Sequence, residues 1–131
     1  MITWSTRHET GHAGVDRDHQ VLFAQINALE DAIKTDATRE ELGQMILFLA
    51  HYVRDHFARE EGVMRAVQCP ASGQNCAAHQ ALKGKLDGWV DRLTADGATT
   101  ALGIEIYREM AAWLEGHIVK VDCQLRTCQS A

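Results

Sequence analysis

Histidines and carboxylates recur in this sequence at spacings that would let them share one metal site. There are seven histidines in 131 residues. His56 and Glu60 are four residues apart, which on a helix places both side chains on one face, about 6 Å apart along the axis. His117 precedes Asp122 by five residues, a looser spacing at which the short aspartate can still turn toward the same ion. Imidazole nitrogens and carboxylate oxygens together form a typical ligand set for iron.

The apolar residues around these groups recur at helical spacing, so we expect helices to position them. His19 precedes Leu22 by three residues and Phe23 by four, within a helix expected from about Val15 to Ile33. Residues at these spacings share one face of a helix, and here that face is apolar. His19 is therefore predicted to point into the core, and His79 supplies a histidine from a third helix.

Start and stop signals along the chain indicate four helices. Thr38 and Glu41 form a capping-box pattern that begins the second helix, and Pro70 ends it. A third helix is expected from about Asn75 to Leu93 and a fourth from about Thr99 to Arg126. Short connections make sequential helices antiparallel neighbours. The predicted fold is all-α, an up-down-up-down four-helix bundle with an N-terminal arm.

Length, composition and charge narrow the class of protein. A chain of 131 residues, 46% of them hydrophobic, has the size of one globular domain, so residues 1–131 are expected to form a single domain. A net charge of −5 without a cluster of lysine and arginine argues against nucleic acid as a partner. The longest apolar run, around Met45 to Ala50, is too short to insert into a membrane, and the N-terminus lacks a signal-peptide pattern. We expect a cytoplasmic protein.

Four cysteines stand at positions that do not match a structural zinc site, because they lack the CxxC spacing. They are Cys69, Cys76, Cys123 and Cys128. A chain without an export signal is expected in a compartment that keeps thiols reduced. The sequence therefore predicts four free thiols.

Six inward side chains together favour a metal centre. A single buried histidine or aspartate is more often satisfied by hydrogen bonds to other core groups than by a metal. Four imidazoles and two carboxylates buried together without a cation would be costly. Bundle cores build dimetal sites from such groups on several helices. The predicted metal ligands are His19, His56, Glu60, His79, His117 and Asp122.

The order and spacing of these residues resemble the bacteriohemerythrin family, nearly from end to end. Around the ligands, the resemblance includes Trp4, Thr10–Gly11, Val15–Asp16, Leu22–Phe23, Ile26–Asn27, Leu29, Tyr52, Phe57, Glu61, Met64, Pro70, Trp113–Leu114 and Ile118. It implies two iron ions, joined by an oxo or hydroxo bridge, that bind dioxygen reversibly for carriage, storage or delivery. No catalytic residue is implied, so the protein is not expected to be an enzyme.

The resemblance also implies a role for each ligand. Glu60 and Asp122 would bridge the two irons. His19 and His56 would bind the iron that takes up dioxygen, and His79 and His117 would bind the other iron. Dioxygen would lie in an apolar pocket whose expected lining is Leu22, Phe57, Trp113, Leu114 and Ile118.

One position departs from the family pattern. A histidine is expected four residues before His79, and Asn75 stands there instead. Two octahedral irons would then keep two open positions where the family keeps one. Asn75 could coordinate through its amide oxygen, a water could complete the shell, or Cys76 could bind as a thiolate. One helical step of about 100° turns Cys76 away from the ligand face, so water or Asn75 is preferred.

Other functions also fit the sequence. The extra open position and the cysteines favour an oxygen, redox or nitric oxide sensor, or a diiron enzyme that reduces peroxide. A sensor would need a separate protein partner. A structural bundle with an inactive or zinc-filled site is a third alternative. The remaining histidines, His8, His12 and His51, are expected at the surface or in the arm, and His12 alone stands where it could hydrogen-bond a ligand.

Overall fold

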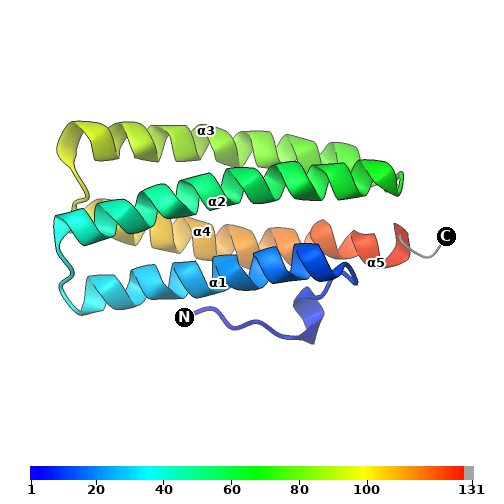
Figure 1. The fold of residues 1–131 in the computed structure, drawn as a ribbon, viewed down its shortest axis with the longest axis horizontal. Helices are drawn as coiled ribbons and strands as arrows, with labels where there is room; N and C mark the ends of the chain where they lie inside the picture. Colours follow the sequence, from blue (N-terminus) through cyan, green and yellow to red (C-terminus); the bar gives the residue numbers. More distant parts are fainter. Residues whose placement is uncertain (129–131) are drawn as a thin grey trace.

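Long helices make up most of the structure, a computed structural model that describes residues 1–128. They are α1 (Ala13–Lys34), α2 (Arg39–Ala66), α3 (Ser72–Asp96) and α4 (Thr100–Lys120). Three short helical turns flank them, namely η1 (Thr6–His8), η2 (Asp122–Gln124) and α5 (Leu125–Cys128). The long helices run alternately in opposite directions, and residues 1–128 contain no strand (Figure 1). The predicted all-α four-helix bundle is confirmed.

The ends of the helices are set by local hydrogen bonds. At the start of α2, the Thr38 hydroxyl accepts from the Glu41 amide at 3.1 Å, and the Glu41 carboxylate accepts from the Thr38 amide at 3.2 Å. The predicted capping box is therefore present. Thr99 caps α4 by accepting from the Leu102 amide at 3.1 Å. α3 ends before Gly97, whose φ of 78° lies in the left-handed region that glycine adopts without a steric penalty.

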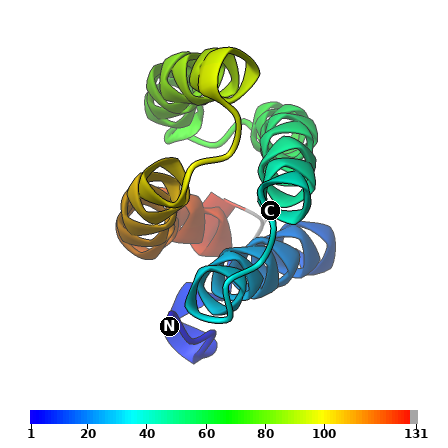
Figure 2. The same ribbon diagram turned by 90° about the vertical axis from the view of Figure 1, so that its left-hand side faces the viewer.

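The antiparallel order brings the predicted ligands to one end of the bundle. Seen end-on, α1 and α3 each lie beside α2 and α4 (Figure 2). The first half of α1, the second half of α2, the first half of α3 and the end of α4 therefore meet at the right-hand end of Figure 1. An apolar core fills the bundle, and Ile26, Ile106 and Met110 are among its fully buried members. None of the helices within residues 1–128 is long and apolar enough to span a membrane.

The fourth helix is shorter than the sequence predicted. The expected continuous helix to Arg126 is broken at Val121, which leads into η2 and α5. In an unbroken helix, Asp122 would lie about 140° around the axis from His117, because each residue advances by about 100°. The break allows Asp122 to turn into the bundle, where 1% of it is exposed. α3 differs less, since it begins at Ser72 rather than three residues later.

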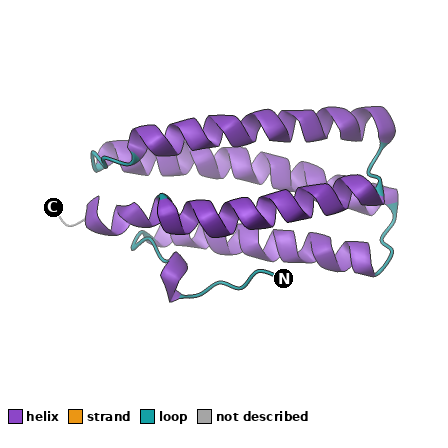
Figure 3. Cartoon of the chain, turned by 180° about the vertical axis from the view of Figure 1, so that it is seen from behind, coloured by secondary structure: helices purple, strands orange, loops and turns teal. Residues whose placement is uncertain are grey.

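Residues 1–12 form the predicted N-terminal arm, which runs beside α1 (Figure 3). The Ile2 amide donates to Asn27 Oδ1 at 3.0 Å, and the Ile2 carbonyl accepts from Asn27 Nδ2 at 2.8 Å. Within the arm, His8 stacks on Trp4 with ring centroids 5.3 Å apart, and its Nε2 lies 3.2 Å from a Glu115 oxygen. His8 lies in the arm, one of the two places expected from the sequence, but it is not at the surface, because the arm folds over the bundle and buries this side chain.

The cysteines are not all free, so the sequence prediction is wrong for two of them. Cys69, in the loop after α2, and Cys128, in α5, form a disulfide with their Cα atoms 5.2 Å apart. Cys76 and Cys123 are free, as predicted. The helix break after α4 turns α5 toward the α2–α3 loop, and Leu125 is buried with Cys69 in a small second core. Local spacing could not indicate this pair, because the two cysteines are 59 residues apart.

Candidate metal centre

The six predicted ligands are buried side by side. Their positions are His19 on α1, His56 and Glu60 on α2, His79 on α3, His117 on α4 and Asp122 on η2. They form two groups in which four potential ligand atoms lie within 4.8 Å of one another. We call them the first group (His19, His56, Glu60, Asp122) and the second group (Glu60, His79, His117, Asp122). Both carboxylates belong to both groups.

Glu60 faces the two groups with different oxygen atoms. Its Oε2 lies 2.9 Å from His19 Nε2 and 3.1 Å from His56 Nε2. Its Oε1 lies 3.3 Å from His79 Nε2. The predicted stacking of His56 and Glu60 on one helical face is present, since both are on α2 four residues apart. A carboxylate arranged in this way can coordinate two ions, one through each oxygen.

Asp122 divides its oxygens in the same manner. Its Oδ2 lies 3.2 Å from His19 Nε2, and its Oδ1 lies 3.0 Å from His117 Nε2. The Nε2 atoms of all four histidines therefore face the two carboxylates. Such a mixture of imidazole nitrogen and carboxylate oxygen suits iron and other divalent transition metals.

Two buried polar atoms of the second group that make no hydrogen bond with a described residue also fit a bound ion. His79 Nε2 and Asp122 Oδ1 are buried and make no hydrogen bond within residues 1–128. Buried polar atoms rarely remain without a partner. A metal ion coordinated by both atoms would satisfy them, so these residues fit the pair of metal ions that the family resemblance implies.

The opposite charges in the cluster change the ionisation of its members. Burial disfavours the charged form of His19, but hydrogen bonds with Asp122 and Glu60 raise the pKa of this imidazole to about 9. Burial also disfavours the charged form of Glu60, yet hydrogen bonds from the surrounding histidines hold the pKa of this carboxyl well below its usual range. A metal ion has to displace protons from the histidines, because imidazole coordinates in its neutral form.

Asn75 lies inside the centre and is fully buried. Its Nδ2 donates to Glu60 Oε1 at 2.7 Å and approaches Met64 Sδ at 3.3 Å. Its Oδ1 accepts from His117 Nε2 at 2.6 Å. Asn75 thus joins two ligand atoms of the second group. Cys76, the alternative ligand considered from the sequence, belongs to neither group among the described residues.

Sequence reasoning missed two carboxylates that hold ligand histidines. Asp18 Oδ2 accepts from His56 Nδ1 at 3.0 Å, and Glu61 Oε2 accepts from His79 Nδ1 at 2.8 Å. Both bonds join residues of different helices, so no local spacing predicts them. One signal was present for Asp18, which stands three residues after Val15 on the apolar face of α1. An acidic residue at a core position indicates a specific buried partner.

Aromatic rings cover the histidines of the second group. Phe57 stacks on His79 with ring centroids 3.7 Å apart and an interplanar angle of 7°. Trp113 stacks on His117 at 4.2 Å and 16°. These two proposed pocket residues therefore contact the second group most closely, although the family resemblance implied a place beside the first. The other proposed pocket residues, Leu22, Leu114 and Ile118, are buried in the main core.

The histidines outside the two groups have separate roles. His12 Nδ1 accepts from the Val15 amide at 3.2 Å and so caps α1. Its ring nitrogen therefore serves the helix end rather than a ligand at the centre. His51 is exposed, as predicted.

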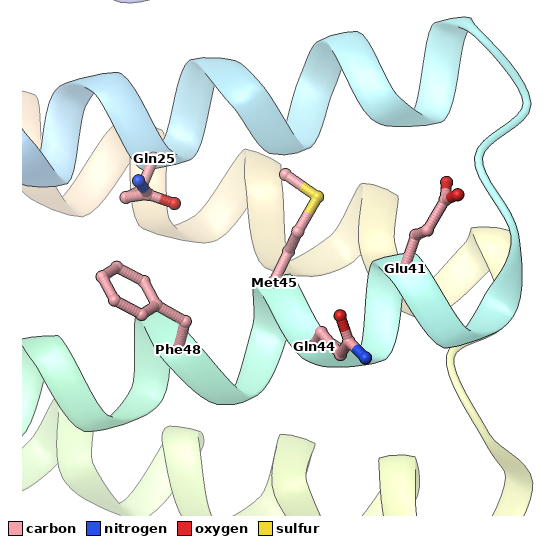
Figure 4. A pocket seen from close by; sticks show the side chains of 5 residues that line it. All are labelled: Gln25, Glu41, Gln44, Met45 and Phe48. Carbon is pink, nitrogen blue, oxygen red and sulfur yellow. The ribbon is translucent and has the colours of Figure 1, made fainter.

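Surface cavities lie away from the ligands. One, of about 480 Å³, opens between α1 and α2, with Gln25 on α1 facing Met45 and Phe48 on α2 (Figure 4). Another, of about 540 Å³, is lined in part by Asp18 and Arg59, and Asp18 also accepts a hydrogen bond from His56. Neither cavity is lined by a member of the two ligand groups.

Comparisons with known proteins agree with this geometry. The family model for the hemerythrin HHE cation binding domain matches residues 10–125. The chain is 30% identical over 134 residues to the bacteriohemerythrin of Methylococcus capsulatus (strain Bath), covering all of this chain and 98% of the relative.

Two solved hemerythrin structures resemble the whole chain, each with a TM-score of 0.87. The wild-type structure is 28% identical in sequence, and the comparison covers 100% of this chain and 99% of that one. A leucine-to-alanine mutant is 27% identical, with 100% and 98% covered. The similarity therefore includes both the helices and the segments that carry the ligand groups.

Proposed function

The chain belongs to the hemerythrin family, and on this premise we propose that it is a non-haem diiron protein that binds dioxygen reversibly for carriage, storage or delivery. The observation that carries the proposal is the division of two buried carboxylates between two histidine pairs. Iron supplies the reversible binding of dioxygen when both ions are present. We propose a cytoplasmic location and no catalytic residue.

We assign each ion two histidines and an oxygen from each carboxylate. The ligands are His19 and His56 for one ion, His79 and His117 for the other, and Glu60 and Asp122 as bridges. The distribution of the carboxylate oxygens supports this assignment, because each oxygen lies within 3.3 Å of a histidine Nε2 of its own group. An oxo or hydroxo bridge between the ions completes the proposed centre.

The protein around the centre has to exclude water, since water promotes oxidation of a dioxygen carrier. Leu22, Leu114 and Ile118 are almost completely buried and lie close in sequence to ligand histidines on α1 and α4. We propose that these side chains form the apolar wall beside the first group. Phe57 and Trp113 perform the same role for the second group through their contacts with its histidines.

Asn75 supports a second candidate function. It offers an amide where the family has an imidazole, so the ion of the second group has one strong donor fewer. Its hydrogen bonds with Glu60 and His117 have to rearrange if its oxygen is to coordinate an ion. A more accessible second ion would favour an oxygen, redox or nitric oxide sensor, or reduction of peroxide.

Anaerobic reconstitution with ferrous iron tests the proposal. We expect about two irons per chain and a visible absorption change that appears with dioxygen and disappears when dioxygen is removed. Irreversible bleaching, or turnover of added peroxide, would favour the second candidate. One iron or fewer per chain after complete reconstitution, or no visible band, would contradict the diiron carrier.

A further inference from the structure

Each ligand group contains one histidine that is held from behind by a carboxylate. His56 Nδ1 donates to Asp18 in the first group, and His79 Nδ1 donates to Glu61 in the second. In both rings the opposite nitrogen, Nε2, faces Glu60. A carboxylate on the far side of an imidazole fixes its tautomer and orientation and makes the ring a stronger metal donor.

The two supporting carboxylates differ in how far their charge is already neutralised. Asp18 accepts two hydrogen bonds from the Arg59 guanidinium, at 2.8 and 3.0 Å, and a third from the Tyr52 hydroxyl at 2.9 Å. Glu61 has no ion pair with a lysine or arginine in the part of the chain that the structure describes. Only 15% of its side chain is exposed, so water screens its charge incompletely. The Cys76 thiol also hydrogen-bonds to Glu61, but this donor carries no charge, so Glu61 polarises its histidine more strongly than Asp18 does.

The stronger support lies in the group that has the weaker ligand set. His79 belongs to the second group, where Asn75 replaces an imidazole and hydrogen-bonds to Glu60 and His117. Phe57 stacks flat on the His79 ring and so restricts rotation of this imidazole. The ring is therefore held by its face and by its Nδ1 atom, with Nε2 directed at the ion's position.

We propose that Glu61 is a positioning residue that compensates for Asn75, by strengthening His79 as the main nitrogen ligand of the second ion. The inference rests on the proposed diiron function. Retention of the second ion then depends on Glu61, and retention of the first ion depends on Asp18.

Release of iron to a chelator from the reconstituted protein tests this inference. Glu61→Gln keeps the size of the side chain and an acceptor for His79 but removes the charge. We expect one of the two irons to leave at least about tenfold faster, the range measured when such supporting groups are removed, while the other is released as in the wild type. Glu109→Gln, which removes an exposed carboxylate on α4 paired with Lys85, is the matched control and should behave as the wild type.

Two further variants separate positioning from a general structural effect. In an Asn75→His background, Glu61→Gln should accelerate iron release much less, because the restored imidazole makes His79 less critical. Arg59→Gln should act in the opposite direction and slow the release of the first iron, since Asp18 then keeps its full charge for His56. Misfolding cannot produce this slower release.

The outcomes separate the proposed diiron function from the role proposed for Glu61. A wild-type protein that never retains two irons overturns the proposed function itself. If the wild type retains two irons, but Glu61→Gln releases both together or neither faster, the inference about Glu61 is wrong while the diiron function stands. Equal effects of Glu61→Gln with Asn75 and with histidine at that position would also overturn it.

Discussion

The first and second ligand groups share Glu60 and Asp122 and have two histidines each, yet their surroundings differ. In the first group, Asp18 holds His56 and is itself paired with Arg59. The second group contains Asn75 and is covered by aromatic rings. Two metal sites that share their carboxylate ligands can therefore differ in how tightly they hold an ion. The difference comes from neutral donors and from the residues that hydrogen-bond to the ligands.

The two groups therefore differ only in residues that belong to one of them, not in the ligands that they share. Removing a shared ligand should affect both ions, whereas changing a residue of one group should affect one ion.

The largest effect is expected for Glu60→Ala, which abolishes the contrast by removing a ligand from both groups. Iron retained after reconstitution and desalting should fall close to zero per chain. His79→Ala removes a ligand from the second group alone, so it should retain about one iron. Equal iron contents of the two variants would show that Glu60 does not serve both ions.

Asn75→His should make the two groups more alike by supplying a fifth imidazole. Asn75 is one helical turn before His79 and already lies among the ligands, so the new ring should reach the second ion. We expect slower release of the second iron by about tenfold or more and slower autoxidation.

Azide binding gives an independent readout of the same variant. With the fifth imidazole in place, azide should bind at one ion rather than at either. If iron release, oxidation rate and azide stoichiometry all match the wild type, Asn75 does not occupy a ligand position.

The disulfide should affect both groups equally, because it closes the end of the bundle next to the shared Asp122. Cys128→Ser is expected to lower the free energy of unfolding by about 2–4 kcal/mol, the usual contribution of a disulfide. Urea unfolding with and without a thiol reductant measures it. Cys123→Ser, which removes a free thiol, is the control. If the reduced protein unfolds at the same urea concentration as the oxidised protein, the prediction is wrong.

The smallest change in iron content is expected for Leu114→Ala, which alters the wall of the centre and no ligand. Leu114 precedes His117 by three residues and is buried, so truncation should open access and speed autoxidation several-fold. Met110→Ala, one turn farther from His117, is the matched control. Both variants should lose about 2–5 kcal/mol of stability, and equal autoxidation rates would place the dioxygen pocket elsewhere.

Much of the fold could be predicted because its signals are local. The capping box at Thr38 and the apolar stripe around His19 each lie within a few residues, and both are present in the structure. The end of the fourth helix was predicted wrongly, since the turn at Val121 follows from the burial of Leu125 and Asp122 against other elements. The position of Asn75 in the centre was also predicted, but its bonds to Glu60 and His117 were not.

The sequence alone determined which side chains could serve as ligands and on which helical faces they lie, because a period of 3.6 residues relates neighbours along one helix. Only the tertiary structure decided how the oxygens of Glu60 and Asp122 are divided, that Asp18 and Glu61 support different histidines, and that Cys69 bonds to Cys128. These contacts join elements far apart in the chain. Their geometry depends on how the helices pack and where the last one breaks, which no local pattern records.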